Sequence, residues 1–162
     1  MHPIAAAIDP RPYLTRGALK PTVVLVVAPA LVLLHRWLAW QRLPWTNTPS
    51  AAALWPLALA FLLFGVVPAL IVKLVFRERL ADYGVRMGDW RLGIAIVAVL
   101  GLVGVLLVYP AARLDSMRSF YPVDPAARES VSAFVRLQLA TLLLFLPGWE
   151  FLHRGFMLHG LR

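Results

Sequence analysis

The sequence predicts an all-α integral membrane protein, a helical bundle with about four transmembrane helices. Hydrophobic residues make up 60% of the 162 residues, against about 45–50% in a soluble globular domain. Charged residues make up only 15%, against about 25% in soluble proteins. A chain of this length has too little interior to bury so much apolar surface in water. Four apolar segments are also long enough to span a bilayer, which takes about 20 residues.

The net charge of +8, from sixteen Lys and Arg against eight Asp and Glu, does not indicate nucleic-acid binding. In a soluble domain so basic a composition would point to nucleic acid. Here most of the basic residues lie in short gaps between apolar segments, where topology and anionic lipid headgroups explain them. We therefore expect the lipid bilayer as a partner and no nucleic acid. The absence of cysteine excludes disulfides, thiolate metal sites and cysteine nucleophiles.

The first two spans are expected at about residues 21–40 and 51–76. An interfacial cluster of three tryptophans accompanies the end of the first span: Trp37, Trp40 and Trp45. The second is the clearest, because the 22 residues from Ala51 to Val72 carry no charge. Thr48 followed by Pro49 is typical of a helix start, with a capping hydroxyl and then a residue that needs no N–H partner.

The third and fourth spans are expected at about residues 91–109 and 131–158. Three glycines of the third, Gly93, Gly101 and Gly104, fall on one helical face and predict a helix-packing seam. The helix of the fourth is expected to start near Asp124 and Pro125, a cap-plus-proline start. The fourth is free of charged residues for only 13 residues, Leu137–Trp149. It is too short to span unless it continues through the charged residues that follow.

The orientation can be inferred from the Lys and Arg residues on either side of the spans. Nine fall within residues 1–20, in the loop between the second and third spans, and at Arg162; six fall on the opposite side. This favours residues 1–20 as a cytoplasmic arm and residues 21–162 as the membrane domain. The arm is too long and too rich in proline for the n-region of a secretory signal, so we expect the first helix to be retained.

The fourth span carries an acid and a cation, Glu150 and Arg154, whose spacing of four residues puts them on one helical face. Charges inside a bilayer are costly and mark functional candidates. One interpretation is a buried ion pair that makes a short apolar span tolerable. The other is a catalytic carboxylate, which keeps its charge beside a guanidinium and can activate a water molecule as a general base.

His153 is the one candidate metal ligand near this pair. Glu150 and His153 form a Glu-x-x-His pair, which di-iron bundles contain twice, together with two further carboxylates. This chain has one copy, and no other expected span has an acid in its interior. We therefore expect no metal site from this chain alone and interpret His153, His159 and His35 as packing or interfacial residues.

The ten residues from Trp149 to Leu158 read Trp-Glu-Phe-Leu-His-Arg-Gly-Phe-Met-Leu. They resemble the first motif of the CPBP intramembrane proteases, the family of CAAX prenyl endopeptidases and of bacteriocin-processing or immunity proteins also called Abi. That motif is Glu-Glu-x-x-x-Arg, usually followed by Gly and an apolar run. Glu150, Arg154 and Gly155 match it, while Trp149 stands at the first Glu position. The segment 82–86, Asp-Tyr-Gly-Val-Arg, is also loosely similar to the family.

The resemblance implies a bacterial plasma-membrane protein in which the family-like domain begins near residue 130. It implies hydrolysis of a prenylated or hydrophobic peptide by a glutamate-activated water, with Glu150 and Arg154 as catalytic residues and Trp149 lining the site. The family is sometimes described as zinc-dependent, so the cofactor stays open.

Two further family motifs lie on later helices and supply His residues and an Asn or Asp. The chain reaches Arg162 without them, so we expect a partial domain that is inactive by itself. The alternative is a non-catalytic membrane protein, either an immunity or scaffold member of the same family or an unrelated four-helix subunit.

Overall fold

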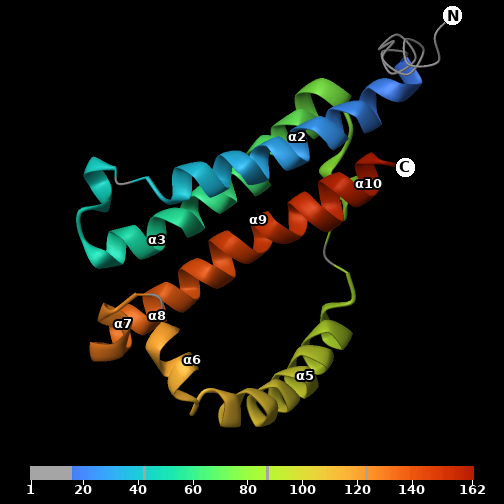
Figure 1. Ribbon diagram of the computed structural model, residues 1–162. Coiled ribbons are helices and arrows are strands. Elements are labelled where there is room, and N and C mark those ends of the chain that lie inside the picture. Colours follow the sequence, from blue (N-terminus) through green and yellow to red (C-terminus); the bar gives the residue numbers. More distant parts are fainter. Residues whose placement is uncertain (1–15, 42, 87, 123) are drawn as a thin grey trace, which may run out of the picture. The chain divides into compact units, whose positions relative to one another are not determined.

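The computed structural model describes residues 16–41, 43–86, 88–122 and 124–162, and all regular secondary structure in these ranges is helical (Figure 1). Four helices are long and apolar enough to cross a membrane, judged by length and composition. They are Leu19–Ala39, Pro49–Phe76, Trp90–Ala111 and Val131–Gly160. These bounds confirm the predicted all-α fold class, and each lies within two residues of the expected span.

The first span belongs to α2 (Arg16–Ala39), so the last residues of the predicted arm are helical. Residues 1–15 of that arm lie outside the described part of the chain. After the short η2 (Pro44–Thr46), the second span begins at Pro49, and the Thr48 hydroxyl accepts the Ala51 N–H at 3.2 Å. This is the cap-then-proline start that the sequence predicts.

The second span is one continuous helix with two wider, π-helical stretches. Its parts are α3 (Pro49–Ala60), η3 (Phe61–Val66), α4 (Val67–Leu70) and η4 (Ile71–Phe76). It ends at Arg77, whose φ of 57° is left-handed, a common way for a helix to stop. The short η5 (Leu80–Tyr83) follows, and then α5 (Trp90–Ala111), the third span, which the Asp89 carboxylate caps.

The start at Asp124 and Pro125 does not open the fourth span. After α6 (Asp115–Phe120), the Asp124 carboxylate accepts the Ala126 N–H and begins only α7 (Ala126–Glu129). Ser130 is extended, and the span starts after it. The span comprises α8 (Val131–Ala140), η6 (Thr141–Phe145), α9 (Leu146–Glu150), η7 (Phe151–Met157) and α10 (Leu158–Gly160).

The chain divides into two compact units. The first contains the described residues up to Gln41 together with Trp55–Val85 and Ala140–Arg162. The second contains residues 43–54 and the described residues of Arg86–Leu139. The core of the first unit draws on all three of its long helices, with Val24, Phe64, Leu152 and Phe156 almost completely buried. Its α2 lies beside η3 of the second span and beside η7 and α10 of the fourth (Figure 1).

In the second unit, α5 has no buried residue. A Cβ placed at Gly93, Gly101 or Gly104 would meet no atom within 4 Å. The predicted seam therefore has no packing partner among the described residues. Small residues permit close helix approach but do not by themselves create a contact.

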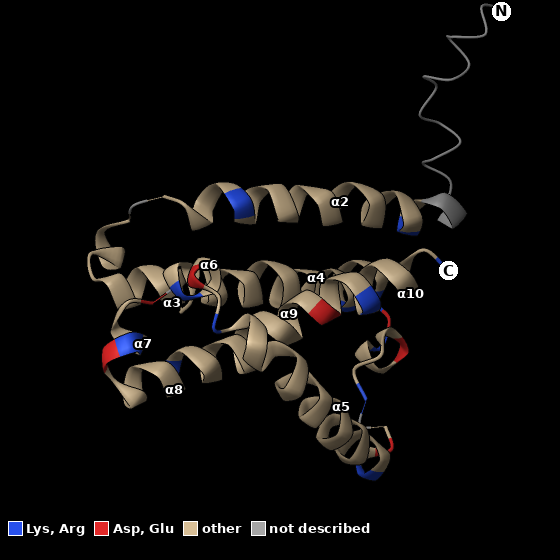
Figure 2. Cartoon of the chain, turned by 60° about the horizontal axis from the view of Figure 1, so that its bottom comes forward, with Lys and Arg blue, Asp and Glu red and all other residues tan. Residues whose placement is uncertain are grey.

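Three helix ends meet in the first unit. Lys20, near the start of α2, bonds to Glu78, two residues after the second span ends. The Val24 side chain of α2 lies against Gly160, the last residue of α10. The first span is therefore antiparallel to both the second and the fourth, and charged residues gather mostly at helix ends and in the connections (Figure 2).

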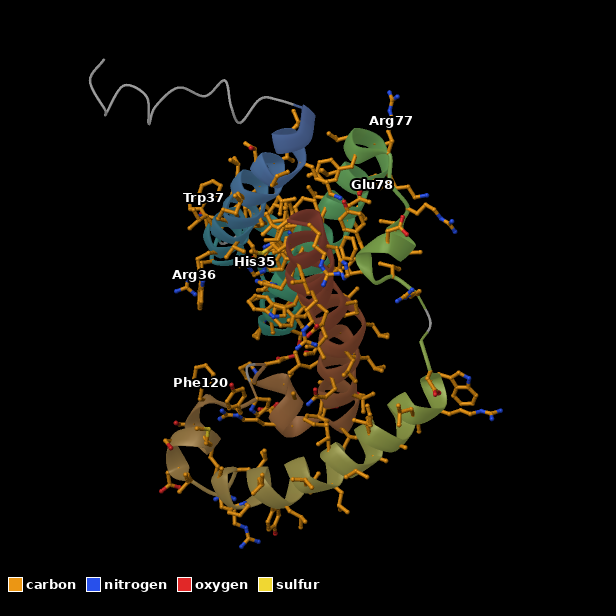
Figure 3. All side chains as sticks on the ribbon, turned by 90° about the vertical axis from the view of Figure 1, so that its right-hand side faces the viewer. His35, Arg36, Trp37, Arg77, Glu78 and Phe120 are labelled. Atoms are coloured by element: carbon orange, nitrogen blue, oxygen red, sulfur yellow. The ribbon has the colours of Figure 1, made fainter. Side chains whose placement is uncertain are left out.

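His35 of α2 points toward its helical neighbours, whereas Arg36 and Trp37 point away from them (Figure 3). Its Nε2 lies 3.0 Å from the Pro56 carbonyl oxygen, and its ring centroid is 4.8 Å from that of Phe64. His35 is therefore a packing residue with a hydrogen-bonded ring nitrogen.

Candidate functional site

Glu150 and Arg154 form the ion pair that their spacing predicts. An Arg154 guanidinium nitrogen lies 3.0 Å from Glu150 Oε2. The protein itself does not enclose this pair, because the Glu150 side chain is 47% exposed and that of Arg154 79%. The reason is helical geometry. The face that packs on other helices carries Gly148, Leu152 and Phe156, and a residue two positions along a helix points to nearly the opposite side.

The pair borders an open hollow of about 390 Å³. One side of the hollow is a single helical stripe with spacings of three and four residues: Pro147, Glu150, Phe151, Arg154, Gly155, Leu158 and His159. The other side is the turn that follows η5, formed by Tyr83, Gly84 and Val85. Residues 83–85 thus face the helical stretch of Glu150 and Arg154 across one hollow.

Two glycines allow the turn to lie close to the helix. Gly84 has a φ of +84°, which a residue without a Cβ adopts easily. A Cβ at Gly155 would lie 2.9 Å from the Tyr83 carbonyl oxygen, so any larger residue there would push the turn away. On the same helix, the His159 ring centroid lies 6.4 Å from that of Tyr83.

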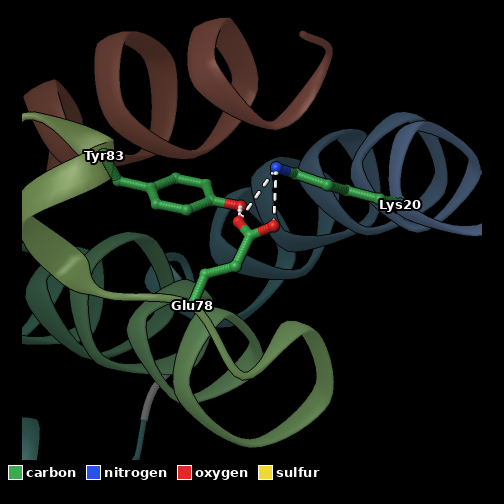
Figure 4. A network of polar contacts seen from close by, with 3 residues as sticks. All are labelled: Lys20, Glu78 and Tyr83. Atoms are coloured by element: carbon green, nitrogen blue, oxygen red, sulfur yellow. Dashed lines mark hydrogen bonds and ion pairs between the residues drawn. The ribbon is translucent and has the colours of Figure 1, made fainter.

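A network of three side chains ties this turn to α2 (Figure 4). The Tyr83 hydroxyl donates to Glu78 Oε2 at 2.5 Å. The Lys20 ammonium donates to both Glu78 oxygens, at 3.1 and 2.9 Å. The bond from Tyr83 first, and then those from Lys20, lower the pKa of the Glu78 carboxyl below its ordinary value. Burial of the ring, and then the bond to Glu78, raise the pKa of Tyr83.

Trp149 does not line the hollow, contrary to what the family resemblance implies for it. Its ring packs among other aromatic rings, with centroid distances of 4.2 Å to His153, 5.7 Å to Phe145 and 6.0 Å to Phe64. It therefore joins α9 to the second span as a packing residue.

His153 also lies outside the residues that line the hollow. Its Nδ1 is 2.9 Å from the Trp149 carbonyl oxygen, which can only accept, so Nδ1 carries the proton. In the described ranges, no three His, Cys, Asp or Glu residues come together as a group that could hold a metal ion. Glu150 and His153 alone do not make the three- or four-ligand set that zinc requires.

Lys20, Glu78 and Tyr83 have no role in the site that the sequence predicts, where Lys20 counts only as a charge that sets topology. The signal that could have drawn attention to Glu78 is its position as a lone acid among the basic residues Lys73, Arg77 and Arg79, directly after a span.

Comparison of the chain with known family models, with curated proteins and with solved structures finds no match.

Proposed function

We propose that the chain carries the first catalytic motif of a CPBP-like intramembrane endopeptidase, with Glu150 as the general base. The observation that supports this most is the hollow beside Glu150 and Arg154, whose other side is the Tyr83–Gly84–Val85 turn. A carboxylate paired with a guanidinium, open to an incoming molecule and next to an apolar wall, suits hydrolysis of a hydrophobic peptide.

In the proposed reaction the Glu150 carboxylate takes a proton from a water molecule, and the water oxygen attacks the carbonyl carbon of the scissile peptide bond. The tetrahedral intermediate then collapses, the C–N bond breaks, and the proton passes from Glu150 to the leaving amine. Arg154 holds the Glu150 carboxylate in place through their ion pair. No step runs through a metal, because the described residues do not offer a ligand set for one.

The proposed substrate is a prenylated or hydrophobic-tailed peptide that reaches the hollow from the bilayer. The proposed location is a bacterial plasma membrane, with the N-terminus in the cytoplasm because of the nine-to-six distribution of Lys and Arg. The developing oxyanion needs separate donors. Arg154, the one permanent cation among the residues of the hollow, is already bound to Glu150, so we propose that groups outside this hollow supply them.

The alternative is a non-catalytic immunity or scaffold protein. The observation in its favour is that Glu150 has its hydrogen-bonding partner in Arg154, while no other acid lines the hollow in the described part of the chain. In that case the pair serves to keep two charges tolerable within a membrane helix.

Cleavage of prenylated and hydrophobic-tailed peptides by the complete product of the gene, purified in detergent, separates the two. We expect cleavage by the parent protein and a loss of about 10²–10⁴-fold in Glu150→Gln, which keeps the shape and removes the base. Glu129→Gln is the matched control, because Glu129 is exposed and outside the spans. Full activity in Glu150→Gln would remove Glu150 from the mechanism, and a parent inactive on every such peptide would favour the non-catalytic alternative.

A further inference from the structure

We infer that Lys20 is a positioning residue of the hollow, which acts from the first span through Glu78 and Tyr83. This inference rests on the proposed function, since it assigns Lys20 to the wall that faces Glu150 and Arg154. We call the three residues Lys20, Glu78 and Tyr83 the latch.

The wall depends on how the Tyr83–Gly84–Val85 turn is attached. Its backbone is a tight turn, with hydrogen bonds from Gly84 N to Ala81 O and from Val85 N to Leu80 O. Val85 itself is 53% exposed, so packing does not fix its outer part. The firm attachment is the Tyr83 side chain, which is only 2% exposed.

Packing and polar contacts hold Tyr83 from different sides. On the helix of the hollow, its carbonyl lies against Gly155 and its ring near His159. On the other side its hydroxyl donates to Glu78. Packing alone would let the Tyr83 ring slide along its neighbours. The hydrogen bond to the Glu78 carboxylate fixes both the distance between Tyr83 and Glu78 and the direction in which the ring points.

Lys20 fixes the carboxylate in turn. Its ammonium bonds to both Glu78 oxygens and lies 5.2 Å from the Tyr83 ring centroid and 5.9 Å from that of Phe76. The Lys20 and Glu78 side chains are 29% and 37% exposed, so water only partly screens their attraction. Without Lys20, the charge that holds Glu78 toward α2 is gone, and Glu78 can turn toward water or the basic residues beside it.

Through the latch, Lys20 in the first span is linked to Glu78, which lies 58 positions later in the sequence. Lys20 is thereby connected to one wall of the hollow. A change at Lys20 should alter the distance between the two walls without touching Glu150 or Arg154. Substrate fit should suffer more than the chemical step, because the wall lines the site and takes no part in proton transfer.

The absence of cysteine from the sequence allows the wall distance to be measured directly. Val85→Cys and Leu158→Cys place spin labels on the two sides of the hollow, at residues that are each 53% exposed. In the complete gene product in detergent, we expect strong dipolar broadening between the two nitroxides. Lys20→Met and Glu78→Gln should reduce that broadening, Lys20→Arg should restore most of it, and Lys73→Met, which removes an exposed lysine outside the latch, should leave it unchanged.

In the peptide-cleavage assay without labels, Lys20→Met should lower kcat/KM by roughly tenfold or more, chiefly through KM, and Lys20→Arg should recover most of the loss. Unchanged broadening in both Lys20→Met and Glu78→Gln would overturn the inference, whether or not the protein cleaves peptides. An unchanged KM in Lys20→Met would overturn the positioning role. Reduced broadening in a protein whose parent cleaves no peptide would support the latch and count against the proposed function instead.

Discussion

Glu150 and Arg154 face outward from a helix that is apolar enough to cross a membrane, so their surroundings decide how strongly they attract each other. The protein leaves about half of the Glu150 side chain and most of the Arg154 side chain exposed. In detergent, where water reaches the hollow, such a pair resembles an exposed ion pair four residues apart on a helix. Pairs of this kind stabilise proteins by about 0.3–0.5 kcal/mol, whereas breaking a buried pair costs about 3–5 kcal/mol.

We therefore expect a coupling free energy below about 1 kcal/mol between these two residues in detergent. The measurement is a double-mutant cycle of Glu150→Gln, Arg154→Gln and the double variant, followed by reversible unfolding. A coupling of several kcal/mol would show that the protein encloses the pair after all.

The latch makes a second prediction at the scale of single residues, about pH. Contacts with Tyr83 and Lys20 lower the pKa of Glu78 below its ordinary value of 4.5. A group whose pKa is lowered by folding stabilises the folded state above its ordinary pKa and loses that effect as the pH falls through the lowered value. The stability difference between the parent and Glu78→Gln should thus be constant near neutral pH and vanish only in strong acid. A difference that instead disappears well above pH 4.5, or is absent at neutral pH, would contradict the latch geometry.

The sequence predicts the pair of Glu150 and Arg154 because a spacing of four residues fixes their neighbourhood within one helix. It does not predict the latch, because Lys20 and Glu78 come together only when two helices pack, and no local pattern records that register. It also misplaces Trp149, which the family resemblance puts at the site, because the indole ring packs on Phe64 and Phe145 instead.

At the scale of helices, apolar length was enough to place the spans, whereas capping residues alone were not. Thr48 and Pro49 start the second span as expected, whereas Asp124 caps only a single helical turn. A cap satisfies the first N–H groups of a helix but does not determine how far the helix runs, which here ends at the extended Ser130.

The glycines show where helix packing is close. The sequence assigned a seam to the third span, but the tight approaches lie on the fourth. A Cβ at Gly148 would lie 2.9 Å from the Ala60 carbonyl oxygen and 3.1 Å from the Phe61 Cα. Both contacts are backbone atoms of the second span, which cannot turn aside as a side chain can.

Gly148→Ala should therefore destabilise the protein by about 1–3 kcal/mol, the usual range for overpacking. Gly101→Ala is the matched control: its Cβ meets nothing within 4 Å, and alanine favours a helix over glycine, so its stability should be unchanged or higher. Unfolding of both variants in the same detergent tests this, and equal stabilities for the two would contradict the packing of the fourth span on the second.

At the scale of the whole chain, four candidate spans make an even number, so the two ends of the membrane domain should lie on one side. The loop between the second and third spans should share that side. Single cysteines at Tyr13 and at Asp82, introduced one at a time, should therefore react with a membrane-impermeant reagent from the same face. Reaction from opposite faces would rule out four spans, and reaction of both from outside the cell would reverse only the orientation.

The packing of the fourth span on the first is the foundation of the site, because it brings Glu150 and Arg154 beside the turn that the latch holds to α2. A Cβ at Gly160 would lie 3.7 Å from the Val24 Cβ, a separation typical of disulfides, whose Cβ atoms lie about 3.5–4.5 Å apart. In this cysteine-free chain, Val24→Cys with Gly160→Cys should form an intramolecular disulfide under mild oxidation. Val24→Cys with Leu158→Cys, whose side chain is 53% exposed, should not. A folded protein whose Val24→Cys and Gly160→Cys thiols both stay free would contradict this packing and, with it, the site built upon it.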